Sequence, residues 1–478
     1  MQHSHDVTPD APHPDPRAVF DRQKAACRAV PILPVAERLN ALAALETLLI
    51  DNQQAIAEAV SLDFGNRAIH ETQLLEIFPT VSGLNHARRK LKKWVRPQRR
   101  HVSLWFAGAS NRVIPQPKGV VGIIAPWNYP LQLALSPLTN ALAAGNRCMI
   151  KMAANSQRLC RLLDRLVSAV FPTDYIAILP GVSAGDFTAL PFDHLVFTGS
   201  PRTGRQVMKT AATHLTPVTL ELGGKSPTII ARDFDIDTAA DRILYIKFMN
   251  AGQTCVAPDY LFLPHQRIEA FVTRAKAVVQ RRYPRLDSPD YTAIIDERAY
   301  LRLLATLDDA RNKGAEIIPL LPGTAPDPVS RKIPPTLALN VTEDMILMQE
   351  EIFGPILPVK PYHELDTVIS YINDRPRPLA LYLFTNARSV QDRVIAETLS
   401  GGVGINDCAI HVAQHDMPFG GVGNSGMGQY HGYEGFLEFS KLRPVFSQAP
   451  LAATALMAPP YGKTFERIYR LMTRWRNI

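Results

Sequence analysis

Three side chains in the sequence have the types that covalent catalysis uses. Asn128 lies in GIIAPWNYP (122–130), after an apolar run, and its amide could donate to a developing oxyanion. Glu221 ends the apolar run of TLELGGKSP (219–227), where partial desolvation would raise the pKa of its carboxyl toward that of a useful general base. Cys255 ends NAGQTC (250–255), where a thiol presented on a loop could act as a nucleophile once ionised.

Each of these residues, taken alone, also has a structural explanation. An Asn before Tyr-Pro suits a turn or a helix cap. A Glu at a strand end can be one half of an ion pair, and a lone Cys is commonly a buried apolar residue. The chemistry therefore depends on elements that bring Asn128, Glu221 and Cys255 together.

The elements around these residues are predicted from alternating apolar and helical segments. Continuous apolar, β-branched runs separated by helices predict a parallel sheet that is buried on both faces, as in doubly wound dinucleotide-binding folds. A second alternating set follows, so the predicted fold class is α/β with two doubly wound lobes, and Asn128 lies at a strand's carboxyl end. The predicted strands are 120–125, 148–151, 175–179, 195–197 and 218–220, then 260–263, 316–319, 379–385 and 402–405, and the helices of the first set include 131–144, 157–170 and 204–213.

Composition excludes several classes of protein. The chain has 478 residues, 46% of them hydrophobic and 20% charged, which is ordinary for a globular protein with two or three domains. No stretch approaches the roughly 18 apolar residues that a membrane helix needs. The first residues have no basic-then-apolar signal pattern, and the five cysteines include no CxxC pair. These features predict a reduced, cytoplasmic protein.

The net charge of +8 comes from one segment, residues 87–100, which holds eight Lys or Arg and no acid. Its apolar residues recur at helical spacing before Pro97, so we expect the basic end of a surface helix rather than a nucleic-acid site, with an acidic-lipid or nucleic-acid patch as the alternative. His411 and His415 are four residues apart but lack a third ligand nearby, and we assign no metal.

The two ends of the chain differ from the rest. Residues 1–16 hold four prolines and little to bury, which predicts a disordered tail. Residues 463–478 read as a basic amphipathic helix that covers the body of the protein. A lid over a substrate entrance and a membrane-surface contact are the alternatives for this helix.

In this order and at these separations, the motifs resemble those of the aldehyde dehydrogenase superfamily over residues 17–445. The 375–384 run RPRPLALYLF and the SGMGQYHG run resemble its class 3 branch, and the ending PPYGKTFERIYRL (459–471) looks most like bacterial coniferyl aldehyde dehydrogenases. The resemblance is carried by APWNYP, FTGSPRTG (197–204), LELGGKSP (220–227), NAGQTC, EEIFGP (350–355) and PFGGVGNSGMGQYHG (418–432).

The resemblance implies the aldehyde dehydrogenase fold, with a small bridging or oligomerisation element and a C-terminal helical tail. It also implies a homodimer that acts on a small aldehyde, without nucleic acid. The implied division is a disordered tail at 1–16, a dinucleotide-binding domain at 17–104 and 118–221, a bridging element at 105–117 and 428–444, a catalytic domain at 222–427 and a tail at 445–478.

The resemblance also implies a reaction. Cys255 would attack the aldehyde carbonyl, the Asn128 amide and the Cys255 backbone N–H would stabilise the oxyanion, and Glu221 would activate water to hydrolyse the resulting thioester. The substrate would be aromatic, such as coniferyl aldehyde, or a medium- to long-chain aliphatic aldehyde. An acylating or reducing relative of the same fold is the alternative enzyme, and a catalytically silent scaffold is the alternative outside enzymology.

The resemblance further implies a nicotinamide cofactor. Gly199 permits a tight turn, and Ser200 lies near the start of a helix whose N-terminus can face a pyrophosphate. The substrate pocket would include Tyr129 and Phe419. The implied cofactor-binding residues are Trp127, Lys151, Thr198, Gly199, Ser200, Gly204, Glu351 and Phe353.

One departure concerns the choice of cofactor. NAD enzymes of this family usually carry a Glu three residues after the lysine, where its carboxylate repels a 2′-phosphate. Here the stretch is Lys151-Met-Ala-Ala154. We therefore predict NAD as the cofactor, with NADP also plausible because of Ala154.

Overall fold

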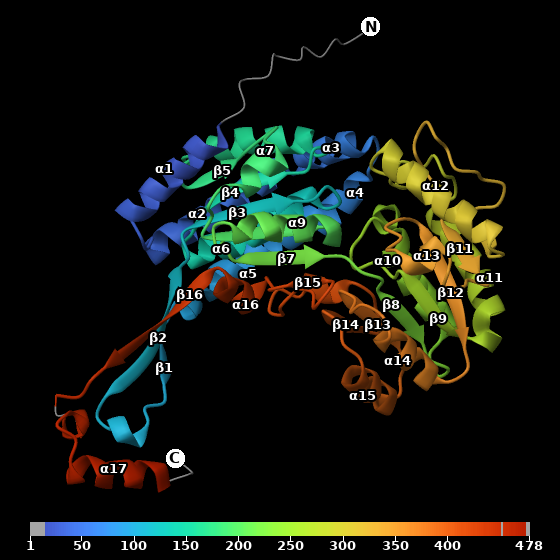
Figure 1. Cartoon of the computed structure of the whole chain (residues 1–478). Coiled ribbons are helices and arrows are strands. Elements are labelled where there is room, and N and C mark those ends of the chain that lie inside the picture. The colour runs from blue at the N-terminus through green and yellow to red at the C-terminus, as the bar shows by residue number, and fades with distance from the viewer. Residues whose placement is uncertain (1–14, 451–452, 475–478) are drawn as a thin grey trace.

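The computed structural model describes residues 15–450 and 453–474 and contains two α/β lobes and a projecting β-arm (Figure 1). Residues 1–14 of the predicted disordered tail (1–16) lie outside the described residues, and its last two residues do not fit the prediction. Pro16 begins the first helix, and the Asp15 side chain caps that helix by accepting the Arg17 N–H at 2.9 Å.

The first lobe is built on a six-stranded sheet in which five strands are parallel. The two-residue edge strand β15 runs antiparallel to β7. The predicted apolar runs overlap the five parallel strands, and the carboxyl ends of these strands lie along one edge of the sheet. In spatial order the strands are β15 (Gly426–Met427), β7 (Val218–Leu222), β6 (His194–Gly199), β3 (Val120–Ala125), β4 (Arg147–Met152) and β5 (Ile176–Ile178).

Helices cover both faces of this sheet (Figure 1). Every residue of α6 is buried, and α5 ends at Trp94 with Lys92 and Lys93 in its last turn, as predicted for the basic segment. The helical elements are α1 (Pro16–Ala29), α2 (Val35–Asp51), α3 (Gln53–Phe64), α4 (Ile69–Thr72), the π-turn η1 (Gln73–Ile77), α5 (Phe78–Trp94), α6 (Pro130–Ala144), α7 (Gln157–Ser168), α8 (Ala184–Thr188), α9 (Pro201–Ala212) and α16 (Gly432–Glu438).

The second lobe is a seven-stranded sheet with a single antiparallel pair, β10 with β11. The two predicted α/β lobes are therefore confirmed, although β8, β11 and β12 are not among the predicted strands. In spatial order the strands are β10 (Glu316–Pro319), β11 (Thr336–Leu339), β12 (Ile356–Tyr362), β9 (Tyr260–Pro264), β8 (Pro227–Ile230), β13 (Ala380–Phe384) and β14 (Gly402–Ile405).

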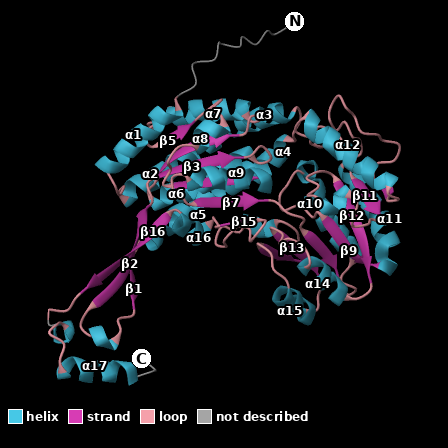
Figure 2. Ribbon diagram, viewed as in Figure 1, coloured by secondary structure: helices cyan, strands magenta, loops and turns pink. Residues whose placement is uncertain are grey.

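Helices also flank the sheet of the second lobe (Figure 2). The chain passes from α10 through the short turn η3 into the loop that carries Cys255. The helical elements are α10 (Ile236–Phe248), η3 (Met249–Gly252), η4 (His265–Arg267), α11 (Ile268–Arg282), α12 (Glu297–Asn312), α13 (Ile346–Gln349), α14 (Leu365–Asn373), α15 (Arg388–Glu397) and η5 (Ile410–Ala413).

The β-arm is a three-stranded antiparallel sheet that extends away from the first lobe (Figure 2). The pairing of β2 with β16 runs from Ser440 opposite Pro117 to Ser447 opposite Ser110, three residues beyond the predicted end of the bridging element at 444. The elements of the arm are β1 (Gln98–Arg100), η2 (Leu104–Phe106), β2 (Ser110–Pro117), β16 (Ser440–Ser447), η6 (Ala453–Met457) and α17 (Lys463–Arg474).

The amphipathic helix α17 lies at the far end of this arm, where it contacts η6 (Figure 1). None of its described residues is buried. The expectation that this helix covers the body of the protein is therefore wrong for the single chain, because the β-arm holds it away from both lobes. No described helix combines the length and apolar character needed to cross a bilayer.

Candidate active site

Asn128, Glu221 and Cys255 line one cavity of about 410 Å³. Asn128 follows β3, Glu221 is the penultimate residue of β7, and Cys255 comes from the loop after η3 in the second lobe. The predicted convergence of the three residues is thus present, at the carboxyl edge of the first sheet, where open α/β sheets bind their ligands.

A second cavity, of about 280 Å³, reaches Cys255 from another direction. We call the first the polar cavity and the second the apolar cavity. Leu133, Cys255 and Phe419 line both, so the partly exposed Cys255 lies where the two cavities meet. The apolar cavity is walled by side chains that include Leu74, Leu75, Phe78, Tyr129, Tyr245, Ile246, Met249, Val256, Ile410, Val412 and Tyr430.

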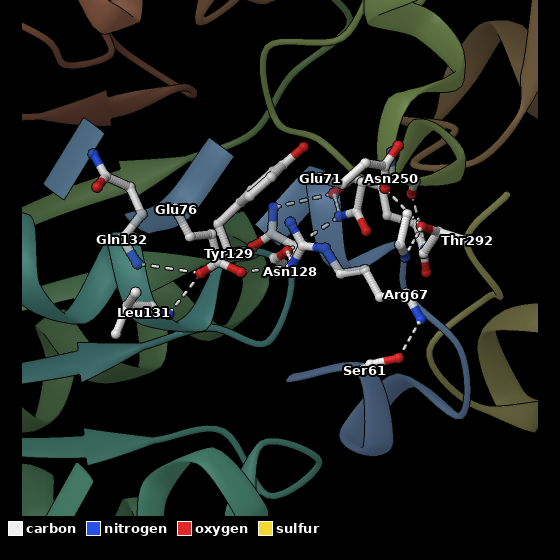
Figure 3. A network of polar contacts seen from close by, with 12 residues as sticks. Ser61, Arg67, Glu71, Glu76, Asn128, Tyr129, Leu131, Gln132, Asn250 and Thr292 are labelled. Carbon is white, nitrogen blue, oxygen red and sulfur yellow. Dashed lines mark hydrogen bonds and ion pairs between the residues drawn. The ribbon is translucent and has the colours of Figure 1, made fainter. Parts of the chain in front are cut away.

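Asn128 is held by its backbone as well as by its side chain (Figure 3). Its carbonyl oxygen accepts hydrogen bonds from Arg67 Nη1 at 3.0 Å and from Asn250 Nδ2 at 3.1 Å. Its own Nδ2 donates to the carbonyl of Gln253 at 3.2 Å. A primary amide carries two N–H donors, so the second hydrogen of this amide is free to serve a ligand in the polar cavity.

A buried ion pair lies behind Asn128, and the sequence motifs gave no sign of it. Arg67 Nη1 lies 2.7 Å from Glu76 Oε1, with both side chains fully buried. The other carboxylate oxygen of Glu76 accepts the N–H groups of Leu131 at 2.7 Å and Gln132 at 3.2 Å, at the start of α6 (Figure 3). A carboxylate that contacts the N-terminus of α6 also interacts favourably with the positive end of the helix dipole. The pair therefore fixes α6 and Asn128 relative to each other.

The loop that carries Cys255 has an unusual backbone. Asn250 and Ala251 have φ values of 52° and 50°, in the left-handed region that costs about 1–3 kcal/mol for residues with a side chain. Gln253 holds this turn through its side-chain amide, which donates to the carbonyls of Asn250 and Ala293, both at 3.0 Å. The strain is thus balanced by buried hydrogen bonds, and Cys255 follows directly on the turn.

Glu71 anchors the same loop from the first lobe (Figure 3). One of its carboxylate oxygens accepts the Asn250 N–H at 2.9 Å, and the other accepts the Thr292 hydroxyl at 2.6 Å. Burial raises the pKa of the Glu71 carboxyl. Like Arg67 and Glu76, this residue lies outside every motif in the sequence, and only the tertiary structure identifies it.

Glu221 is 2% exposed, and neither of its carboxylate oxygens has a hydrogen-bond partner among the described residues. The alternative reading of Glu221 as half of an ion pair therefore does not hold. Burial raises the pKa of Glu221 well above its usual value, and the charge of Glu438 raises it further. A carboxylate with a raised pKa is a stronger base, as suits a group that takes a proton from water.

Cys255 has a raised pKa, of about 12, mainly because of burial and secondly because Glu351 and Glu221 lie nearby. The thiol of the unliganded protein is thus protonated near neutral pH. A cation bound in the polar cavity would offset both carboxylates and lower the pKa of Cys255. Nucleophilic activity of Cys255 is therefore expected to depend on a positively charged ligand.

The structure brings together most of the predicted cofactor residues, but two of them do not line the polar cavity. Gly204 lies in α9, where an added Cβ would stand 2.9 Å from Leu222 Cδ2, so it permits close packing of the helix on β7. Lys151 is half-buried on β4, opposite Ile124 of β3, at the same sheet edge. The predicted residues that do line the polar cavity are Trp127, Thr198, Gly199, Ser200, Glu351 and Phe353.

These residues fit a nicotinamide dinucleotide. Ser200 caps α9 by accepting the Thr203 N–H at 3.4 Å, so the positive end of α9 opens onto the polar cavity and can face a pyrophosphate. Thr198 has a buried hydroxyl with no protein partner among the described residues. Phe353 meets Trp127 edge to face, with ring centroids 5.4 Å apart, which gives the cavity an aromatic wall.

Glu351 approaches the backbone at Gly223 very closely. A Cβ built on Gly223 would stand 2.1 Å from Glu351 Oε2, so only glycine leaves room for this carboxylate. Burial raises the pKa of Glu351 to about 8, and the charge of Asp259 acts in the same direction. Glu351 is therefore a partly buried carboxyl group with a raised pKa on the wall of the polar cavity.

The predicted substrate-pocket residues Tyr129 and Phe419 both line the apolar cavity. The Tyr129 hydroxyl pairs with Thr254 Oγ1 at 2.5 Å. The Phe419 backbone exchanges two hydrogen bonds of 2.8 Å with Tyr430, and its ring stacks on His431 at 5.5 Å. Across residues 15–450 and 453–474, no three His, Cys, Asp or Glu side chains gather as metal ligands.

Comparison with known proteins places the chain in a family. Residues 6–445 match the model of the aldehyde dehydrogenase family. A Pseudomonas aeruginosa protein named probable coniferyl aldehyde dehydrogenase is 52% identical over 461 residues, 96% of either chain. Aldehyde dehydrogenase family 3 member A2 of Pongo abelii is 39% identical over 90% of this chain and 88% of its own, which confirms the resemblance to the class 3 branch.

A solved structure agrees with this placement. The substrate-bound state of Staphylococcus aureus AldH superposes with a TM-score of 0.89 at 36% identity, over 95% of this chain and 99% of the other. The predicted fold is thereby confirmed. The chain belongs to the aldehyde dehydrogenase family and is an enzyme that oxidises an aldehyde with NAD(P).

Proposed function

We propose that this enzyme oxidises an aromatic aldehyde of the coniferyl type to its carboxylic acid, with Cys255 as nucleophile, Asn128 as oxyanion donor and Glu221 as the base for hydrolysis. The single observation that carries this proposal is the meeting of the polar and apolar cavities at Cys255. A thiol at that junction can hold a substrate carbon between an apolar pocket and a cofactor.

The proposed steps follow from the positions of the side chains. Cys255 Sγ attacks the carbonyl carbon, and the oxyanion of the thiohemiacetal accepts hydrogen bonds from Asn128 Nδ2 and the Cys255 N–H, each worth about 3–4 kcal/mol. A bound nicotinamide would supply the acceptor for the hydride that leaves the thiohemiacetal carbon, so that a thioester of Cys255 remains. Glu221 then takes a proton from the water that attacks this thioester, and the acid is released with Cys255 as the thiolate.

The substrate proposal rests on the apolar cavity and on the named relatives. At about 280 Å³, this cavity has nearly the size of a small-ligand pocket. Its walls are mostly apolar, and their polar groups include Gln132, His431 and the Tyr129–Thr254 hydroxyl pair. An aromatic ring with a short unsaturated chain suits these walls, and the Pseudomonas aeruginosa relative is named for coniferyl aldehyde.

The presence of Glu221 favours a hydrolytic enzyme over a relative that passes its acyl group to coenzyme A. Transfer of the acyl group to a thiol does not require a base that activates water. We expect Glu221→Gln to give a burst of about one reduced cofactor per active site and then to stop. Normal turnover by the Gln variant, without a burst, would reject Glu221 as the base.

The cofactor is proposed to be NAD, with NADP also accepted. Ala154 is exposed on the turn after β4 and offers no carboxylate against a 2′-phosphate. Lys151 is proposed to reach the adenosine ribose from the same sheet edge, and Glu351 and Phe353 to hold the nicotinamide side.

We also propose that two chains form a homodimer through the β-arm. The antiparallel sheet projects from the body, and Leu442 and Phe446 of β16 are exposed on it. We propose a dinucleotide-binding domain at 17–104 and 118–221, a catalytic domain at 222–427 and a bridging element at 105–117 and 428–444. The pairing of β1 with β2 supports starting the arm at Gln98, and the pairing of β15 with β7 supports assigning Gly426–Met427 to the first lobe. The five cysteines are all free, as suits a cytoplasmic enzyme.

The experiment is an absorbance assay of NADH or NADPH formation with coniferaldehyde, benzaldehyde and a medium-chain aliphatic aldehyde. We expect the highest kcat/KM with coniferaldehyde. A kcat/KM for the aliphatic aldehyde above that for both aromatic ones would overturn the aromatic proposal. No activity with any of the three, from folded and reduced protein, would overturn the proposed roles of the residues as well.

A further inference from the structure

A cavity of about 580 Å³ lies on the opposite side of the first lobe from the active site. Gly119 precedes β3, Arg147 begins β4, and Asp193 precedes β6, so the cavity opens at the amino ends of the strands whose carboxyl ends carry the active site. A six-residue strand spans roughly 20 Å. A ligand in this cavity would therefore not touch the substrate or the cofactor.

Five cationic side chains line this cavity, against one carboxylate. They come from distant parts of the chain, namely α1, the β2–β3 turn, β4 and β16, so tertiary folding assembles them (Figure 1). We call this site the basic cavity. Its charged residues are Lys24, Arg28, Lys118, Arg147, Arg443 and Asp193.

The one carboxylate already has partners. Asp193 forms an ion pair with Lys24, whose Nζ lies 2.9 Å from both carboxylate oxygens, and it accepts the Val120 N–H at 2.7 Å. It can therefore neutralise little beyond Lys24. The other four cations of the basic cavity have no carboxylate within ion-pair distance among the described residues.

Arg147 is the residue that points most clearly to a ligand. Arg147 is 6% exposed, and its Nη1 makes two long contacts, to the Val30 carbonyl at 3.4 Å and to Cys27 Sγ at 3.6 Å. A buried guanidinium without a carboxylate is costly unless another anion completes its hydrogen bonds. The planar guanidinium fork suits phosphate oxygens well.

Lys118 is a second cationic donor in the basic cavity without a carboxylate partner among the described residues. Its Nζ lies 3.1 Å from Nδ1 of His194. Burial lowers the pKa of His194 to about 3, with Lys118 acting in the same direction, so the ring is neutral and cannot compensate the charge. The ammonium group thus keeps donors for an anion in the basic cavity.

We propose that the basic cavity binds a small phosphate-bearing anion of the diphosphate class. The charge, the buried Arg147 fork and the volume of about 580 Å³ together fit a ligand with two or more negative charges. This binding is separate from the aldehyde reaction and needs no step of it.

Cys27 supplies a reporter inside the basic cavity. Its thiol is partly exposed, whereas Cys148, Cys160 and Cys408 are buried. In the full-length wild-type enzyme, alkylation of Cys27 by iodoacetamide is followed by mass spectrometry of its peptide. The reaction is run at pH about 9, because burial raises the pKa of this thiol above its ordinary value. Inorganic pyrophosphate at millimolar concentration, with ionic strength matched by NaCl, is expected to slow this alkylation about tenfold.

The exposed Arg28 and Arg443 are the residues to change, because Arg147 is buried and replacing it would also disturb the packing around it. In Arg28→Gln/Arg443→Gln, half-protection of Cys27 should need roughly tenfold more pyrophosphate. The matched control is Arg161→Gln/Arg165→Gln, which removes the same charge from exposed positions of α7 outside the cavity and should behave as wild type.

Three results would overturn the proposal. The first is an absence of protection at millimolar pyrophosphate. The second is equal protection in the Arg28/Arg443 and Arg161/Arg165 variants, which would mean that net charge alone attracts the anion. The third is protection by benzoate at the same concentration as pyrophosphate, which would show a site for carboxylates instead. Activity is not the readout, so none of these results depends on the proposed substrate.

Discussion

Arg67 Nη1 contacts the backbone carbonyl oxygen of Asn128 at 3.0 Å while also donating to Glu76 at 2.7 Å. One guanidinium thus joins the residue proposed to stabilise the oxyanion to the carboxylate that caps the start of α6. The rings of Phe64 and Tyr129 pack against it, with centroids 5.2 and 4.9 Å from the guanidinium carbon. The position of Asn128 therefore depends on a side chain that reaches no substrate.

Arg67→Lys is expected to lower kcat about tenfold to a hundredfold, because a single ammonium group cannot reproduce the guanidinium fork and a small displacement of a catalytic amide is costly. The matched control is Arg38→Lys at the other end of α6, where Arg38 is buried and donates to the carbonyls of Ala143 and Ala144. Both variants should unfold at lower temperature, but only Arg67→Lys should lose kcat. Equal losses of kcat would mean that α6 as a whole, rather than Asn128, is affected.

Glu221→Gln is expected to change the pH dependence of stability. The pKa of Glu221 is raised in the folded protein, so above pH about 4.5 the unfolded chain loses a proton that the folded chain keeps. The wild type therefore loses stability as pH rises from that value to the folded pKa, while the Gln variant has no such group. We would measure the free energy of unfolding of both proteins with denaturant at pH 5, 7 and 9. The value for the variant should rise relative to that of the wild type as pH increases. A difference that stays constant with pH would contradict a raised pKa of Glu221.

Gly223→Ala is expected to raise the KM for NAD roughly tenfold, as for one lost hydrogen bond to a charged group, because the new Cβ would displace the Glu351 carboxylate. The neighbouring Gly224→Ala is the control. A Cβ there meets its nearest atom, Pro378 Cα, at an ordinary 3.4 Å. The KM for NAD of both variants is obtained from initial rates at varied NAD and fixed aldehyde. An unchanged KM in Gly223→Ala would show that Glu351 does not contribute to cofactor binding.

Ala154→Glu is expected to raise the preference for NAD over NADP about tenfold or more, through repulsion of the 2′-phosphate. Ala154→Gln has the same size without the charge and should leave the preference nearly unchanged. The ratio of kcat/KM for the two cofactors is the measurement. A wild-type ratio already above about a thousand, or roughly 4 kcal/mol, would show that Ala154 does not relax cofactor choice.

Much of the fold could be predicted because the apolar runs are long and regularly spaced. The strands of the first lobe, and with them the placement of Asn128 and Glu221 at one sheet edge, follow from local pattern alone. The motif around Cys255 marked its loop in the same way. These signals are local in the sequence, and parallel sheets bring their strand ends together by geometry.

The supporting groups could not be predicted in the same way. Arg67, Glu71 and Glu76 act through contacts more than 50 residues away along the chain, and nothing adjacent to them indicates those partners. The amphipathic pattern of α17 was recognised, but a pattern identifies an apolar face without identifying what lies against it. Lys151 was placed by family resemblance, and its side chain does not line the polar cavity.

The division of the site into two cavities has a consequence for large substrates. Glu221 lines the polar cavity and not the apolar one, so the proposed base draws its water from the cofactor's side of the thioester. A bulky acyl group can then fill the apolar cavity completely without blocking the water that hydrolyses the thioester. Tight binding of the hydrocarbon part of the substrate is therefore compatible with rapid release of the acid.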